Sequence, residues 1–212
     1  MKYLSNISRT KVLNIVGSIL IIGGLIFAIP ALYYRWTNAG SAAASPVTAA
    51  QVWGEANSNS GSHSNEKLVT GFPVSISIPG PRAAANIGVG IIPGYYNAKT
   101  NGWTLTETDA QFAVISAQPN NISGNTFIYG HYRPNVFAYL HLITPGTIAT
   151  ITTNNGYKFN YKFINTYAVT PTDTAVLSNS QNPILTLQTC SGSFFQNRQM
   201  YIFSYVNYAK VQ

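Results

Sequence analysis

Acidic residues are scarce in this sequence. Asp and Glu together number 5 among 212 residues, and charged residues make up 8% of the chain, far below the roughly one quarter that is usual in globular proteins. A dedicated calcium site is not expected, because calcium usually takes several carboxylate ligands. Glu107, Asp109 and Asp173 do not form a metal-binding cluster. We predict neither a metal nor a cofactor.

Cysteine is nearly absent as well, with Cys190 as its single occurrence. One cysteine excludes an intramolecular disulfide framework. A lone buried thiol is usually inert packing, whereas an unpaired thiol in an extracellular domain is a candidate reactive group.

Basic residues are present but form no stripe. The net charge of +7 arises mainly from the shortage of acids, and three of the 12 cations, Lys2, Arg9 and Lys11, precede the long apolar segment. This distribution predicts mild attraction to anionic envelope polymers and no binding of nucleic acid.

The apolar segment, residues 12–34, carries no charge. About 20 apolar residues span a bilayer core, and aromatic residues such as Tyr33 and Trp36 mark its far end. More cations precede the segment than follow it, so the N-terminus is expected in the cytoplasm. We therefore predict a cytoplasmic leader (1–11), a single-pass transmembrane helix (12–34) in the cell membrane and an extracellular remainder. A cleaved signal peptide, cut near residues 42–44, is the alternative.

Residues 35–66 read as a flexible linker rich in Ala, Ser, Asn and Gly. From residue 67 to 212 the texture changes to short apolar runs between turn signals. Strands are expected at 74–78, 87–92, 103–106, 124–129, 147–152, 157–163, 184–190 and 198–206. Residues 110–117 fit either a helical turn or a strand, and 137–143 fit a short helix. Asn155-Gly156 marks a hairpin. Such a pattern predicts one all-β barrel or sandwich.

Two strand-like runs near the C-terminus bracket the only thiol. The first begins after Pro183 and ends at Cys190, and the second opens with Arg198. A Gly130-His131 pair follows an earlier strand. A thiol needs a neighbouring imidazole or positive charge to supply thiolate at neutral pH. Cys190 and His131 lie far apart in sequence, so they must meet through the fold, at the rim where strands of a barrel end.

This combination resembles the signature of the sortases, the cysteine transpeptidases of bacterial surfaces. The TLxTC motif of that family is matched by Thr186-Leu187-Gln188-Thr189-Cys190, and its histidine and arginine by His131 and Arg198. A spaced Phe, Leu, Leu and Gly after the histidine is matched by Phe137, Leu140, Leu142 and Gly146. The resemblance covers about residues 67–211. It implies a closed eight-stranded sortase-type β-barrel with short helices.

The resemblance also implies a reaction. Cys190 would attack a peptide carbonyl and form a thioester, while His131 would protonate the leaving amine and then deprotonate the incoming one. Arg198 would hold the substrate backbone or the developing oxyanion, and Thr189 would help to shape the substrate site. The expected partners are surface proteins with a C-terminal LPxTG-like sorting signal, and an amine of a cell-wall precursor or a pilin as acceptor.

Some points depart from the family pattern or leave alternatives. Thr147 replaces an acidic residue that often follows the Gly, and the calcium dependence of some sortases does not carry over to so acid-poor a chain. The subclass stays open. An L,D-transpeptidase would show Ser-His-Gly-Cys instead of the residues before Cys190, and papain-like hydrolases place the cysteine before the histidine. A non-catalytic, membrane-tethered β adhesion or assembly module is the other alternative, and convergence of Cys190, His131 and Arg198 would argue against it.

Overall fold

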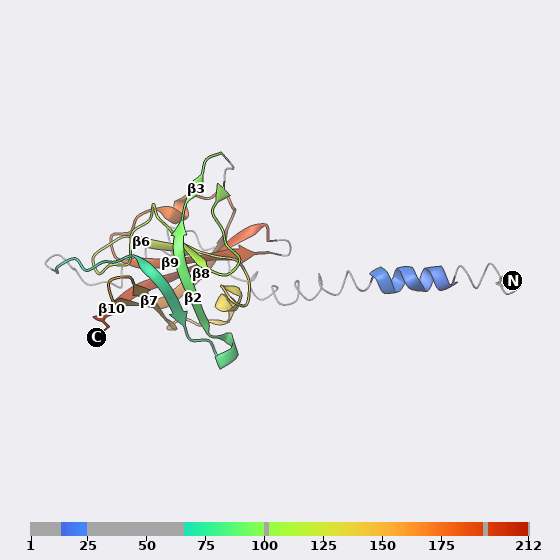
Figure 1. Cartoon of the computed structure of the whole chain (residues 1–212), viewed down its shortest axis with the longest axis horizontal. Helices are drawn as coiled ribbons and strands as arrows, with labels where there is room; N and C mark the ends of the chain where they lie inside the picture. The colour runs from blue at the N-terminus through green and yellow to red at the C-terminus, as the bar shows by residue number, and fades with distance from the viewer. Residues whose placement is uncertain (1–13, 25–65, 100–101, 193–194, 212) are drawn as a thin grey trace, which may run out of the picture.

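The computed structural model describes residues 14–24, 66–99, 102–192 and 195–211. Eight strands close a barrel in the order β1-β2-β5-β6-β9-β10-β8-β7. Figure 1 shows several of these strands, among them β2, β6 and β9, gathered in one body. The strands are β1 (Pro73–Ile78), β2 (Ile87–Gly94), β5 (Ala110–Ala113), β6 (Asn125–Tyr129), β7 (Ile148–Thr153), β8 (Tyr157–Val169), β9 (Ile184–Ser191) and β10 (Asn197–Lys210). The predicted all-β, closed eight-stranded barrel is confirmed.

Short strands and helices lie outside the barrel sheet. Strands β3 (Tyr96–Asn97) and β4 (Gly102–Trp103) pair in a separate two-stranded sheet. Among the described residues, three 3₁₀ helices, η2 (Ala83–Ala85), η3 (Ala138–Leu142) and η4 (Ala175–Leu177), lie in the connections. The predicted strand at 103–106 is wrong beyond Trp103, because only Gly102 and Trp103 pair with β3 and residues 104–106 form no strand.

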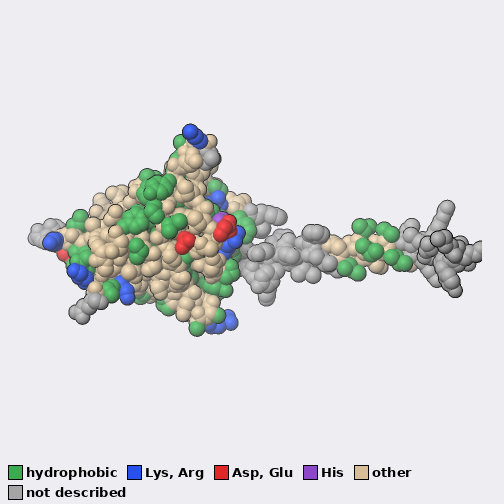
Figure 2. Space-filling model, in the orientation of Figure 1, with side chains coloured by type: hydrophobic (Ala, Val, Ile, Leu, Met, Phe, Trp, Pro, Cys, Tyr) green, Lys and Arg blue, Asp and Glu red, His purple; other side chains and the backbone are tan. Residues whose placement is uncertain are grey.

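Alternation of apolar and polar residues explains the barrel wall. In β8, Phe159, Tyr161 and Phe163 are buried, whereas the adjacent Lys158 and Lys162 are exposed. Side chains alternate between the two faces of a strand, so one face fills the barrel and the other meets solvent. Little of that solvent face is charged: Figure 2 shows scattered Lys, Arg, Asp and Glu on a mostly uncharged surface.

The ambiguous segment 110–117 resolves into strand β5 followed by a turn. The helix expected at 137–143 is the 3₁₀ helix η3. The hairpin at Asn155-Gly156 is confirmed between β7 and β8, with Gly156 at φ 81°, a left-handed conformation that suits glycine.

Strands β8 and β10 run longer than their sequence patterns indicated. They pair with each other over most of their length, with irregular register between Ile202 and Phe203 and between Tyr205 and Asn207. A bulge shifts the inside–outside alternation, so a strictly alternating pattern stops short of the true strand end.

Part of the predicted membrane segment lies outside the described residues. Residues 14–24 form a helix, and the rest of 12–34, the leader 1–11 and the linker up to residue 65 are not described. Within the described part of the chain, no helix has the length and apolar character needed to cross a membrane.

Candidate active site

Cys190 lies near the end of β9, between β6 and β10. Its neighbours Thr189 and Ser191 are buried on the inner face, whereas Cys190 is only half-buried, as alternation along a strand requires. The thiol is free. It therefore faces outward at the strand end, where a substrate can reach it.

His131 follows β6, which runs parallel to β9. The register pairs Tyr129 with Gln188, and the backbone N–H of Gly130 donates to the carbonyl of Gln188 at 3.0 Å. Continued for two residues, this register brings His131 level with Cys190. The His131 carbonyl then accepts hydrogen bonds from the backbone of Arg133 at 2.9 Å and Phe137 at 3.2 Å. These bonds hold the histidine at the start of a tight loop.

Gly130 has a packing reason to be glycine. A Cβ atom at this position would lie 2.7 Å from Val136 Cγ1 and 3.1 Å from Phe137 Cδ2. The loop after His131 folds back over the strand end, and only a residue without a side chain leaves room for it.

Arg198 lies opposite Cys190 in the antiparallel pairing of β9 with β10. Its Nη1 donates to the carbonyls of Phe195 at 3.1 Å and Asn197 at 3.2 Å. The side chain is half-buried. The structure thus places Cys190 in β9, Arg198 in β10 and His131 just after β6, at one end of three adjacent strands.

Two hollows meet at Cys190. The histidine-side hollow, about 1010 Å³, contains His131, Cys190 and several polar and aromatic side chains. Its lining consists of His131, Tyr132, Arg133, Pro134, Asn135, Ala138, Tyr139, His141, Leu142, Cys190 and Phe195. Within it the Nδ1 atom of His141 lies 2.6 Å from the carbonyl of Ala138, which accounts for this second histidine as a local structural contact.

The arginine-side hollow, about 290 Å³, contains Cys190 and Arg198. Apolar side chains make up much of its wall. Its lining consists of Gly102, Trp103, Leu105, Phe127, Tyr129, Gly130, Pro171, Asp173, Thr174, Val176, Leu177, Gln188, Cys190 and Arg198. Apart from Gly130, Gln188, Cys190 and Arg198, these wall residues belong to no sequence motif, and the sequence did not identify them as site residues. Phe127 and Tyr129 could have been found, because they belong to the strand that leads to the Gly-His pair.

Tyr129 fixes one wall of the arginine-side hollow. Its hydroxyl donates to the carbonyl of Thr104 at 2.9 Å, and its ring contacts Trp103 with centroids 5.5 Å apart. Burial raises the pKa of the Tyr129 phenol above its ordinary value. The contact anchors the segment after β4 to β6.

Thr189 lies apart from both hollows. It is 1% exposed, and its hydroxyl is buried without a hydrogen-bond partner among the described residues. Its contribution to substrate binding stays a prediction. Among the described residues, no group of three or more His, Cys, Asp or Glu side chains could hold a metal ion.

Comparison with known proteins identifies the family. The family model described as the sortase domain matches residues 76–210. A search of curated proteins found no match. Among solved structures, sortase A of Listeria monocytogenes aligns with a TM-score of 0.52 and 16% identity, covering 67% of this chain and 92% of that one.

Two further structures give the same result. The SrtA sortase of Actinomyces oris aligns with a TM-score of 0.51 and 18% identity over 68% of this chain and 86% of its own. Sortase A of Corynebacterium diphtheriae aligns with a TM-score of 0.51 and 22% identity over 64% of this chain and 62% of its own. At these identities the structural likeness shows the fold, while the family match covers most of the barrel. The chain belongs to the sortase family and is a cysteine transpeptidase.

Proposed function

We propose that this protein cleaves an LPxTG-like sorting signal near the C-terminus of surface proteins and transfers the acyl group to an amine. The observation that carries the proposal is the position of Cys190, which borders both the hollow that contains His131 and the hollow that contains Arg198. A nucleophile placed between a proton-transfer group and a cation has what acyl transfer requires.

The first half of the reaction is formation of a thioester. His131 takes the proton of the Cys190 thiol, the sulfur attacks the threonine carbonyl of the sorting signal, and the electron pair of the C=O bond moves onto oxygen. Arg198 offers guanidinium N–H groups to that developing oxyanion or to the peptide carbonyls beside it. When the tetrahedral intermediate collapses, the C–N bond breaks, and His131 gives a proton to the departing glycine amine.

The second half reverses these steps with a new amine. His131 removes a proton from the incoming amine, which attacks the thioester carbonyl, and the Cys190 thiolate leaves. The acceptor is an amine of a cell-wall precursor or of a pilin subunit. Thr189, whose side chain is buried on the inner face of β9 next to Cys190 in the chain, would support the shape of the substrate site from inside the barrel.

The two hollows suit different parts of this reaction. The apolar wall of the arginine-side hollow, with Trp103, Phe127 and Val176, fits the leucine and proline of a sorting signal. The histidine-side hollow suits the leaving and incoming amines, because His131 must exchange a proton with each of them.

We infer further that residues 12–34 anchor the protein in the cell membrane, with residues 1–11 in the cytoplasm and the catalytic barrel outside. The uncharged length of the segment and the cations before it support this topology. External protease on intact cells should remove the barrel and leave a membrane-bound N-terminal fragment. A mature protein that begins near residues 42–44 would instead show a cleaved signal peptide.

The transpeptidase activity is tested with the full chain in detergent, an LPxTG peptide and hydroxylamine. Mass spectrometry follows the peptide hydroxamate and a thioester on the protein. We expect product from the wild type, none from Cys190→Ala, and about a hundred- to ten-thousandfold slower product formation from His131→Ala.

A peptide library with varied sorting motifs is the control for a wrong choice of peptide. If no peptide in the library gives a thioester or a hydroxamate, the proposed substrate class is wrong, and a non-catalytic adhesion or assembly module is favoured.

A further inference from the structure

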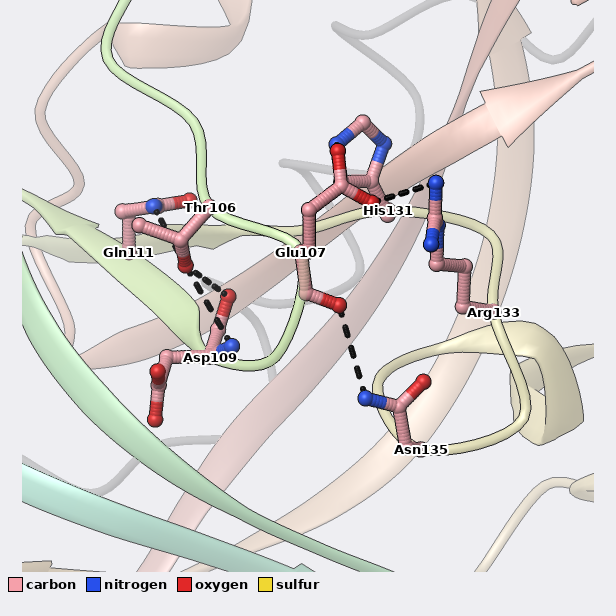
Figure 3. Close-up of polar contacts among 7 residues, drawn as sticks. All are labelled: Thr106, Glu107, Asp109, Gln111, His131, Arg133 and Asn135. Atoms are coloured by element: carbon pink, nitrogen blue, oxygen red, sulfur yellow. Dashed lines mark hydrogen bonds and ion pairs between the residues drawn. The ribbon is translucent and has the colours of Figure 1, made fainter.

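A carboxylate approaches the histidine from a loop that the reaction above does not use. Glu107, in the segment between β4 and β5, has its Oε1 3.7 Å from Nε2 of His131, and its Oε2 forms an ion pair with Arg133. Figure 3 shows the carboxylate of Glu107 between the imidazole ring and the guanidinium group. Sequence reasoning weighed Glu107 only as a metal ligand.

The loop that carries Glu107 is itself held in place. The Thr106 hydroxyl accepts hydrogen bonds from the backbone N–H of Asp109 at 3.3 Å and from Nε2 of Gln111 in β5 at 3.1 Å. The Glu107 carbonyl accepts from Nδ2 of Asn135 at 3.4 Å. The backbone is thereby tied both to the barrel and to the loop that follows His131 (Figure 3).

The two carboxylate oxygens have separate partners. Because Oε2 is engaged by Arg133, Oε1 is left directed toward His131. Its distance to Nε2 is that of an ion pair rather than a short hydrogen bond. Such contacts around catalytic groups often shorten once substrate is bound, and the attraction grows when the ring takes a proton from the thiol or the amine.

We propose that Glu107 is a positioning residue for His131. The carboxylate holds the proton of His131 on Nε2 and orients the ring, so that Nδ1 is the nitrogen that exchanges protons with the thiol and the amines. The hydrogen bond at one ring nitrogen generally decides which chemistry the other performs. The inference rests on the proposed function, in which His131 transfers these protons.

The expected effect is moderate because the contact is exposed. The side chains of Glu107 and Arg133 are 63% and 51% accessible, and exposed ion pairs are weak. We expect Glu107→Gln to lower kcat about three- to tenfold, with KM changed by less than about twofold. Glu107→Asp keeps the charge on a shorter side chain and should restore part of kcat.

The structural readout is the ¹⁵N NMR spectrum of the imidazole rings in the full chain, labelled at its three histidines. His131→Gln assigns the signals of residue 131. In the wild type we expect the pattern of a ring protonated on Nε2, and in Glu107→Gln a shift toward the mixed pattern of an unrestrained ring. Asp109→Asn is the matched control: it removes a carboxylate from the same loop without contacting His131, and it should retain the wild-type spectrum and kcat.

Arg133→Gln tests whether Glu107 acts on the His131 ring directly or only by attaching its loop to the loop after His131 through Arg133. The proposal expects the Nε2-protonated pattern to persist in this variant, because Glu107 still faces the ring. The proposal is overturned if Arg133→Gln reproduces the spectrum of Glu107→Gln, or if Glu107→Gln leaves both spectrum and kcat unchanged. Absence of turnover in the wild type would contradict the proposed function instead. The spectra would still report whether Glu107 determines which nitrogen of the His131 ring carries the proton.

Discussion

The catalytic chemistry at the scale of single residues depends on groups that are each ordinary alone. Cys190 is half-buried and unpaired, His131 is partly accessible, and Arg198 bonds to carbonyls of its own loop. Their reactivity depends on their neighbours: a nearby imidazole helps the thiol to lose its proton, and a guanidinium stabilises the oxyanion that forms on the substrate. The roles are therefore best tested by substitutions that change one chemical property at a time.

Arg198 offers such a test. Arg198→Ala removes the donors proposed for the oxyanion and should lower kcat about a hundred- to a thousandfold. Arg198→Lys keeps the charge but loses the planar set of donors, and should recover only part of that rate. Steady-state kinetics with the sorting peptide measures both. Arg82→Ala, next to η2 and away from both hollows, is the control. Full activity in Arg198→Ala would rule out the proposed role.

At the scale of elements, the site depends on how β6, β9 and β10 end. The parallel register of β6 with β9 and the antiparallel register of β9 with β10 bring three distant positions of the chain to one rim. The loop after β6 must then turn sharply enough to keep His131 there, and Gly130 makes that turn possible.

Gly130→Ala tests this dependence. Because the added methyl group would press on Val136 and Phe137, we expect a loss of about 1–3 kcal/mol in the free energy of unfolding, together with lower activity from a displaced His131. Urea unfolding and peptide kinetics measure the two effects. Gly88→Ala in β2 is the matched control, since a Cβ there meets no atom within 4 Å. Equal stability of the two variants would contradict the packing argument.

At the scale of the whole molecule, aliphatic and aromatic side chains together fill the barrel. Tyrosine is abundant, with 14 residues against 5 acids, and several phenols point inward. Burial raises the pKa of Tyr205 to about 12 and raises the pKa of Tyr161 and Tyr201 well above the ordinary 10.0. These groups stay protonated in the folded barrel where the unfolded chain would ionise.

The pH dependence of stability follows from this difference. Above pH 10 the unfolded chain loses phenol protons that the folded chain keeps, so unfolding releases protons and the stability falls as pH rises. We expect full stability below pH 10 and a progressive loss above it, complete once the folded phenols ionise as well. Urea unfolding between about pH 8 and 12 checks this. Tyr161→Phe should lessen the slope, and an unchanged slope would show that Tyr161 does not contribute to it.

The sequence by itself determined the fold class, the family and the identity of the reacting groups. Alternation in 74–78 and 157–163, the turn at Asn155-Gly156 and the residues around Cys190 are local signals, because a side chain's preference for a strand face or a turn acts over a few neighbours. The long ends of β8 and β10 were missed for the same reason: a bulge interrupts the local pattern while pairing with the neighbouring strand continues.

Only the tertiary structure decided what surrounds the reacting groups. The apolar wall with Trp103, Phe127 and Val176 comes from β4, β6 and η4, three separate elements that share no common motif. The contact of Glu107 with His131 joins two loops on either side of β5 and β6. Strand order and register determine which residues become neighbours in this way, and both are properties of the closed barrel as a whole. A local pattern of residues therefore cannot predict these contacts.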